Sequence, residues 1–205
     1  MAEAVAAGRR HVLDGVEAGG EIQRMLASEA GFELRPAPDA TRHVLRLTPE
    51  EAAKRMDVFG FDVTRAVNTA AGHETLATET PHASLRLGPD EWMLIGELPA
   101  AAPTEAGGAK LVDISHRDVA FELGGRAVRD VLATGIALDL DDEAFAVGTA
   151  TRTLFAKAEI VLVRCSDVEG GARFRLECWR SFARYLAAHL RQSAALLGAA
   201  SSDRH

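Results

Sequence analysis

The chain has 205 residues, 47% of them hydrophobic and 26% charged, which is typical of a globular protein large enough to bury a core. A formal net charge of −7 argues against nucleic acid or an anionic membrane as a partner, because neither attracts an acidic surface. The first residues, MAEAVAAGRR, lack a signal-peptide core, and no run approaches the roughly 20 apolar residues that a membrane span needs, so a cytoplasmic protein is expected.

Residues 1–41 predict an extension rather than a folded unit. Ile22, Met25 and Leu26 can form one face of a short helix, and residues 35–39, with two prolines, predict a linker.

Regular structure is expected from residue 42 onward. Residues 43–47 alternate as a strand does. Thr48 can cap a helix and Pro49 suits its first position, while Glu51 can close a capping box, so a helix to about residue 57 is expected. Residues 58–80 give no clear pattern.

The middle of the chain predicts strands followed by a helix. Residues 83–98 predict a hairpin with its turn at 88–90, and 110–115 and 117–123 predict two more strands. A helix follows Gly124-Gly125, with Gly135 expected to end it.

The C-terminal part repeats this order of strands and helix. Residues 161–163 form an apolar run typical of a strand buried on both faces, residues 167–171 predict a turn, and 173–179 alternate as a strand. A helix follows, with its apolar face spaced by four residues. Trp179 and Tyr185 are expected to pack in the core rather than to form a platform on which a ligand stacks. The apolar face of this helix consists of Phe182, Leu186 and Leu190.

The pattern therefore predicts an α+β fold, with helices packed on one face of a largely antiparallel or mixed sheet. We expect an N-terminal extension over 1–41, one domain over 42–195 and a disordered tail over 196–205.

The two cysteines are not expected to form a disulfide. In a hairpin that turns near residues 168–169, Cys165 faces about Ala172 and Cys178 faces about Ile160, so the sulfurs lie several strand residues apart. Both thiols are predicted to be reduced, and neither has an adjacent base that would make it a nucleophile.

Common catalytic and ligand-binding motifs are missing from the sequence. The glycine pairs at 124–125 and 170–171 lack the spacing of a phosphate or dinucleotide loop, and the seven histidines form no metal-binding pattern. Asp113, Ser115 and His116 are triad-type residues, but on a strand the first two point away from the third. A strand end that fixes the next turn, or that meets a partner, is the preferred interpretation.

Several arginines add to this candidate interface. A guanidinium at a sheet edge is either solvated or paired with a carboxylate, which an anion or a partner chain can supply. The candidate partner interface comprises Asp113, Ser115, His116, Arg117, Arg152, Arg164 and Arg180.

Six strings occur in one order along the chain: LGPDEWMLI at 87–95, VDISH at 112–116, GGRAVRDVL at 124–132, LDL at 138–140, FAVGTATRTLFAK at 145–157 and RSFA at 180–183. Together they resemble the gamma subunit of heterotetrameric sarcosine oxidase over roughly residues 42–192.

This resemblance implies an assembly of alpha, beta, gamma and delta subunits that oxidatively demethylates sarcosine to glycine. Oxygen is reduced to peroxide, and the methyl group leaves as formaldehyde or passes to tetrahydrofolate. The resemblance places FAD and FMN, NAD, the folate site and zinc on the other subunits, and implies no cofactor and no catalytic residue on this chain. It also implies a fold similar to part of the folate-binding aminomethyltransferases.

One departure bears on folate. In the aminomethyltransferases a Gly-Phe-Glu segment supplies a glutamate to the pterin, whereas this chain has Arg175 at the corresponding place. Arginine cannot accept the pterin's N–H donors. Folate binding by this chain is therefore not expected. The alternative hypothesis is a stand-alone folate-binding or one-carbon-transfer protein, and an interaction domain of unrelated function is a third.

Overall fold

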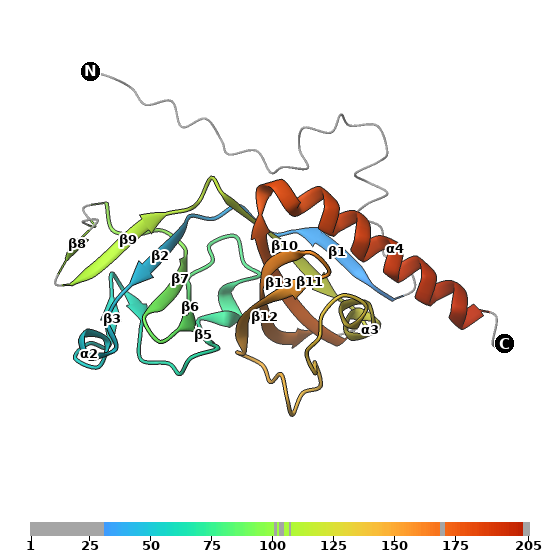
Figure 1. The fold of residues 1–205 in the computed structure, drawn as a ribbon, viewed down its shortest axis with the longest axis horizontal. Coiled ribbons are helices and arrows are strands. Elements are labelled where there is room, and N and C mark those ends of the chain that lie inside the picture. The colour runs from blue at the N-terminus through green and yellow to red at the C-terminus, as the bar shows by residue number, and fades with distance from the viewer. Residues whose placement is uncertain (1–30, 101, 103–104, 107, 169–170, 203–205) are drawn as a thin grey trace, which may run out of the picture.

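The computed structural model describes residues 31–202 except 101, 103–104, 107 and 169–170. The short helix expected near residues 22–26 lies outside them. The described strands form two larger antiparallel sheets and one small hairpin, which lie side by side in Figure 1. The α+β fold class and the antiparallel pairing are confirmed, and the structure divides the strands between two sheets.

The five-stranded sheet holds the C-terminal hairpin at its centre. Its strands lie in the order β1 (Glu33–Pro36), β10 (Asp118–Gly124), β13 (Gly171–Trp179), β12 (Ala158–Val168) and β11 (Ala150–Phe155).

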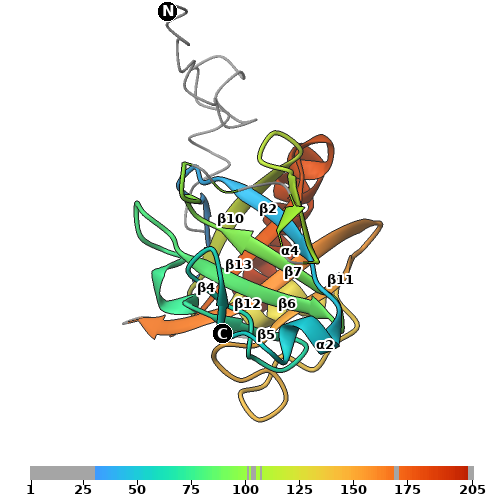
Figure 2. The ribbon, with the colours of Figure 1, turned by 90° about the vertical axis from the view of Figure 1, so that its left-hand side faces the viewer.

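The six-stranded sheet holds the predicted hairpin of residues 83–98. Its order is β5 (Thr69–Ala71), β6 (Ala83–Gly88), β7 (Glu91–Ile95), β2 (Arg42–Arg46), β9 (Ala109–Asp113) and β8 (Glu105–Ala106). Figure 2 views the molecule from this side, with the long C-terminal helix behind the sheet.

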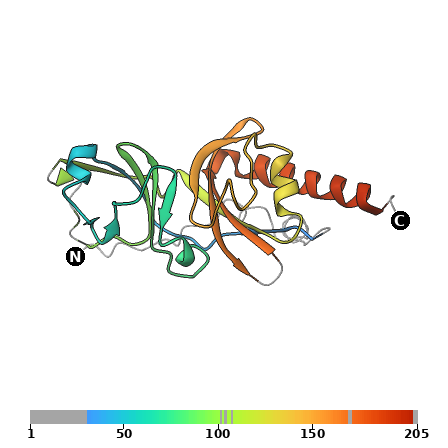
Figure 3. The same cartoon turned by 90° about the horizontal axis from the view of Figure 1, so that it is seen from below.

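Helices cover the outer face of the five-stranded sheet. These are α3 (Val128–Ala133) and α4 (Ala183–Ser202), preceded by the 3-10 turn η2 (Arg180–Phe182). Leu186 and Leu190 of α4 are fully buried against Phe155 and Leu176 of the sheet, as the four-residue spacing predicted. Figure 3 shows α4 running along this part of the molecule to one end.

The other face of the five-stranded sheet packs on the six-stranded sheet. Val161 and Val163 of β12 belong to a buried cluster with Leu85, Met93 and Ile95 of the second sheet. Because Leu162 between them faces the helices, β12 is buried on both faces, which confirms the prediction for residues 161–163.

A smaller core covers the far face of the six-stranded sheet. Trp92 and Leu94 pack there under α2 (Pro49–Ala52) and the hairpin of β3 (Asp57–Val58) and β4 (Phe61–Asp62). The Thr48 side chain accepts a hydrogen bond from the Glu51 N–H at 3.2 Å, as expected of an N-cap. The helix ends at Ala52 and not near 57, because the chain turns there into β3.

Both ends of the domain reach further than predicted. Residues 33–36 form β1, paired with β10, so the linker prediction is wrong there, and Pro36 is tolerated because β1 is an edge strand. The tail prediction is wrong over 196–202, because α4 continues to Ser202. Alanine is the strongest helix former, which explains why this small-residue segment is helical.

The two cysteines are free and buried, which confirms that they are not paired with each other. Cys178 lies opposite Ile160 as predicted, but Cys165 lies opposite Arg173, one residue from the expected Ala172. The pairs Ile160–Cys178 and Cys165–Arg173 share one uninterrupted register, and the bulge between Cys165 and Val168 lies beyond them, next to the turn.

Candidate functional site

A buried charged network lies where the two sheets meet. Arg42 of β2 donates from Nε to Glu177 of β13 at 2.6 Å, and Arg175 of β13 donates from Nε to the other carboxylate oxygen at 2.7 Å. Each of these three side chains is at most 2% exposed. We call these three residues the seam triad.

Both guanidiniums of the seam triad also bind backbone carbonyls. Arg42 donates from Nη1 to Ala40 at 2.7 Å, and Arg175 donates from Nη1 to Leu76 at 2.6 Å, immediately after the 3-10 turn η1 (His73–Thr75). Glu177 and Arg175 belong to one sheet, while Arg42 and Leu76 lie on the side of the other. The triad therefore joins the two sheets by directional bonds.

The local sequence explains why these charges lie inside. On β13, Phe174, Leu176 and Cys178 face the helices, so Arg175 and Glu177 face the second sheet. The alternation predicted the apolar face correctly. The polar face is buried as well. The opposite charges of Arg175 and Glu177, two residues apart, are the feature of the sequence that could have indicated this burial.

The electrostatic balance keeps Glu177 ionised. Burial alone would raise the pKa of its carboxyl group, but the charges of Arg42 and Arg175 outweigh burial and hold that pKa below its usual value. Burial opposes the charge on Arg42 too, yet Glu177 raises the pKa of that guanidinium. The carboxylate is thus fully used as a structural acceptor.

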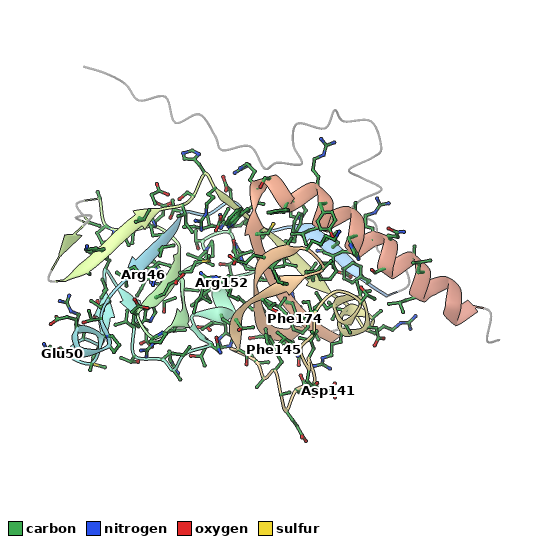
Figure 4. All side chains as sticks on the ribbon, viewed as in Figure 1. Arg46, Glu50, Asp141, Phe145, Arg152 and Phe174 are labelled. Atoms are coloured by element: carbon green, nitrogen blue, oxygen red, sulfur yellow. The ribbon has the colours of Figure 1, made fainter. Side chains whose placement is uncertain are left out.

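A second ion pair crosses the seam at Glu91 of β7, which also binds an arginine of its own sheet. This buried carboxylate binds Arg46 of β2, at 2.7 Å, and Arg152 of β11 in the other sheet. Figure 4 shows Arg152 in the middle of the molecule, between the two groups of strands, and Arg46 within the six-stranded sheet. The Glu91 carboxylate is the largest contributor to the raised pKa of Arg152.

Five of the seven predicted interface residues gather where the chain passes from β9 to β10. Asp113 accepts a hydrogen bond from the Ser115 N–H at 2.8 Å, and Ser115 Oγ in turn accepts the Arg42 N–H at 2.9 Å. These polar side chains therefore fix the turn, which was one of the two roles that the sequence suggested for this strand end. Arg180 donates from Nε to the His116 carbonyl at 3.1 Å and brings η2 to the same place.

Arg117 is the fifth residue of this group, and it lies next to the seam. It donates to both carboxylate oxygens of the buried Asp118, at 2.8 and 3.3 Å. Burial raises the pKa of Asp118, and the charge of Arg117 offsets part of that rise. Arg117 and Arg152 line one narrow crevice of about 20 Å³ together with Asp118 and Glu177.

Arg164 lies elsewhere, on the helix-covered face of the five-stranded sheet. Its side chain is fully buried, with Nη1 donating to the Cys165 carbonyl at 2.8 Å and Nη2 to Asp167 at 2.5 Å. Its guanidinium lies over the Phe174 ring at 5.1 Å. A solvated edge is the wrong interpretation of Arg164, because its side chain is fully buried and its carboxylate partners belong to its own chain. Ser115, only 1% exposed, is likewise an internal residue.

The buried thiols are poorly suited to nucleophilic chemistry. Burial raises the pKa of Cys165 to about 11, and it raises the pKa of Cys178 further. Within the described residues, no group of three or more His, Cys, Asp or Glu side chains could hold a metal ion. None of the described helices is long and apolar enough to cross a membrane.

The core prediction for Trp179 and Tyr185 is wrong. These side chains are 43% and 39% exposed, because Trp179 ends β13 and Tyr185 lies on a flank of α4 that nothing in the described chain covers. Arg42, Glu91 and Glu177 were missed as site residues, because the ion pairs Arg42–Glu177 and Glu91–Arg152 join residues that are far apart in the chain.

Comparison with known proteins agrees with this architecture. The family model of the sarcosine oxidase gamma subunit matches residues 49–196. The chain belongs to the sarcosine oxidase gamma subunit family. This confirms the resemblance carried by the six strings. A search of curated proteins found no match.

Two solved structures resemble the fold of this gamma subunit family member. One is heterotetrameric sarcosine oxidase from Corynebacterium sp. U-96 in complex with pyrrole 2-carboxylate, with a TM-score of 0.73 and 24% identity over 93% of this chain and 96% of that one. The other is the glycine cleavage system aminomethyltransferase T from Bartonella henselae, with a TM-score of 0.55 and 14% identity over 82% of this chain and 47% of that one. The expected similarity to an aminomethyltransferase fold is confirmed.

Proposed function

We propose that this chain is the non-catalytic gamma subunit of a heterotetrameric sarcosine oxidase and supports the assembly and stability of the flavoprotein subunits. The family match over residues 49–196 carries the proposal. The seam supports a scaffold role, because Glu177 and Glu91 are each held by two guanidiniums of the same fold. A carboxylate held in this way is not available as a general base.

The proposed partners are the alpha, beta and delta subunits, which carry FAD, FMN, NAD, the folate site and zinc. Together the subunits oxidise sarcosine at its C–N bond with oxygen as acceptor. We place the complex in the cytoplasm, and the two free thiols, Cys165 and Cys178, are consistent with a reducing compartment.

The proposed partner interface centres on the passage from β9 to β10. Asp113, His116 and Arg117 are exposed there, and Arg152 and Arg180 retain part of their surface. Ser115 positions the turn from inside, and Arg164 lies outside this group.

Purification of the tagged chain from its native cell, followed by mass spectrometry, tests the proposal. The expected result is co-purification of the alpha, beta and delta subunits together with flavin absorbance. A parallel purification from untagged cells gives the background. Recovery of the tagged chain alone would contradict the assignment.

Arg175 separates this function from the folate-binding alternative. Its guanidinium is buried and bonded to Glu177 and to the Leu76 carbonyl, so the place of the pterin-binding acid holds a donor that is already engaged. Equilibrium dialysis of the chain against tetrahydrofolate is expected to detect no micromolar binding, and binding in that range would favour the alternative.

A further inference from the structure

Asp118, the first residue of β10, is a buried carboxylate that lies beside the seam triad. Its side chain is 4% exposed, and within the described chain its hydrogen bonds come from Arg117, which donates from Nε at 2.8 Å and from Nη2 at 3.3 Å. The register places Asp118 directly opposite Trp179 of β13, so Glu177 lies diagonally across from it on the same face. Two carboxylates therefore lie near each other where little solvent reaches them.

These two carboxylates are held unequally. Glu177 accepts from two guanidiniums that are themselves buried, whereas Asp118 has a single arginine, whose side chain is 49% exposed. A buried charge is stabilised by close counter-charges and opposed by a like charge nearby. Burial and the charge of Glu177 accordingly raise the pKa of Asp118, whereas the pKa of Glu177 stays below its usual value. As the pH falls, Asp118 is therefore the first of the two to take up a proton.

A narrow crevice of about 20 Å³ connects both carboxylates with solvent, because its walls include the partly exposed side chains of Trp179 and Arg152. This volume admits about one water molecule, so a proton can reach Asp118 while the fold stays closed. The charged and titratable groups around Asp118 are Arg117 in the preceding turn, Arg42 of β2, Glu177 and Cys178 of β13, Arg152 of β11 and Glu159 of β12.

The position of Arg117 depends on the charge of Asp118. While it is bonded to the carboxylate, its guanidinium lies over the Trp179 ring at 5.7 Å. A protonated carboxyl offers one carbonyl acceptor and an O–H donor in place of two charged acceptors, so the two-point contact with Arg117 ends. A half-exposed arginine that is no longer held gains side-chain entropy by moving into water.

We propose that Asp118 and Arg117 form an acid-sensitive latch at the start of β10, in which protonation of Asp118 releases the Arg117 guanidinium from the carboxyl group and from the face of Trp179. Because the folded-state pKa of Asp118 is raised, the stability that this group contributes rises as pH falls through that pKa and is complete below the unfolded value of about 3.9. The latch thus opens within the folded chain. It needs no partner subunit, so it stands or falls separately from the proposed function.

An NMR titration of the full chain tests the latch, with carbon-13 in the aspartate carboxyl groups and nitrogen-15 in the two indoles. Asp118→Asn and Trp179→Phe each identify a signal by its loss. The Asp118 carboxyl should titrate with a midpoint above the ordinary value of about 3.9, and the Trp179 indole should shift with the same midpoint. The indole of the fully buried Trp92 should not follow it. A midpoint of Asp118 at or below the ordinary value, or an unmoved Trp179 signal, would overturn the inference.

Asp118→Asn also imitates the protonated state, because the amide is uncharged and similar in shape. In this variant the Trp179 signal at pH 7 should already have the position that it reaches in acid in the unmodified chain, and it should no longer titrate. Glu159→Gln is the matched control: its side chain lines the same crevice and is 51% exposed, so the transition should remain. A transition that persists in Asp118→Asn, or that Glu159→Gln removes, belongs to another group and refutes the latch. If Asp118→Asn does not fold, the agreement of the aspartate and indole midpoints in the unmodified chain still decides.

Discussion

Glu177→Gln is the sharpest test of the seam triad, because it removes one charge and changes little in shape. The carboxylate accepts from Arg42 at 2.6 Å and from Arg175 at 2.7 Å, and its side chain is 1% exposed. The amide leaves two buried guanidiniums without a counter-charge and turns an N–H₂ group toward one of them. Breaking a buried ion pair on one side costs about 3–5 kcal/mol of unfolding free energy.

Urea unfolding followed by circular dichroism measures this loss. With a urea dependence of about 2.5 kcal/mol per molar, a loss of about 4 kcal/mol lowers the midpoint by roughly 1.5 M. Glu159→Gln is the matched control: its side chain is 51% exposed and lies 3.7 Å from Arg152, so it should cost less than about 1 kcal/mol. Equal midpoints for the two variants would refute the reasoning.

The difference in unfolding free energy between the unmodified chain and Glu177→Gln should depend on pH, which gives a second check. The folded-state pKa of Glu177 lies below its unfolded value, so its contribution is fully present above the unfolded pKa of about 4.3 and is lost as pH falls through the folded pKa. The gap between the unmodified chain and Glu177→Gln should therefore be constant from pH 6 to 8 and narrow in acid. A gap that widens in acid would contradict the assignment of the charge.

Three further predictions concern local structure. Thr48→Ala removes the cap of α2 and should lower the unfolding free energy by about 1 kcal/mol, with an unchanged urea midpoint as the contrary result. Gly135→Ala places a methyl group 2.8 Å from the Phe155 ring and should cost about 1–3 kcal/mol in the same assay, part of which Phe155→Leu should restore if the clash is the cause. Ellman's reagent at pH 8 should modify neither Cys165 nor Cys178 in the folded chain and both in urea, and rapid reaction of either folded thiol would contradict their burial.

The sequence could predict most strands, because each shows its own alternation, but it could not predict which strands pair. Residues 110–123 read as two consecutive strands of one sheet. In the structure β9 pairs with β2, whereas β10 pairs with β13 in the other sheet. The change of sheet occurs at residues 114–117, where the local sequence contains only the polar turn that also suits a hairpin.

The interior of the candidate site was hidden for the same reason. Alternation on β13 separates Phe174 and Leu176 from Arg175 and Glu177, and a charged strand face is usually solvated. Only the second sheet, formed from distant residues such as Arg42, turns that face into an interior. The candidate residues at 113–117 were accessible to sequence reasoning because they are neighbours in the chain and share one turn.

The seam triad can be replaced by three apolar side chains of similar volume, which separates its contribution to stability from its contribution to the placement of the sheets. Replacing a complete buried ion network by apolar groups of similar volume is often neutral or stabilising, so Arg42→Met, Arg175→Met and Glu177→Leu together should keep the urea midpoint near that of the unmodified chain. The apolar triple variant, however, loses the bonds of Arg42 and Arg175 to the Ala40 and Leu76 carbonyls, which fix one sheet against the other. The proposed partner interface takes residues from both sheets, so it would depend on that placement. We therefore expect the triple variant to fold stably but, when it is expressed in one cell with a differently tagged unmodified copy, to enter the complex less than that copy. Equal entry of the two copies would show that the charges do not set the placement of the sheets.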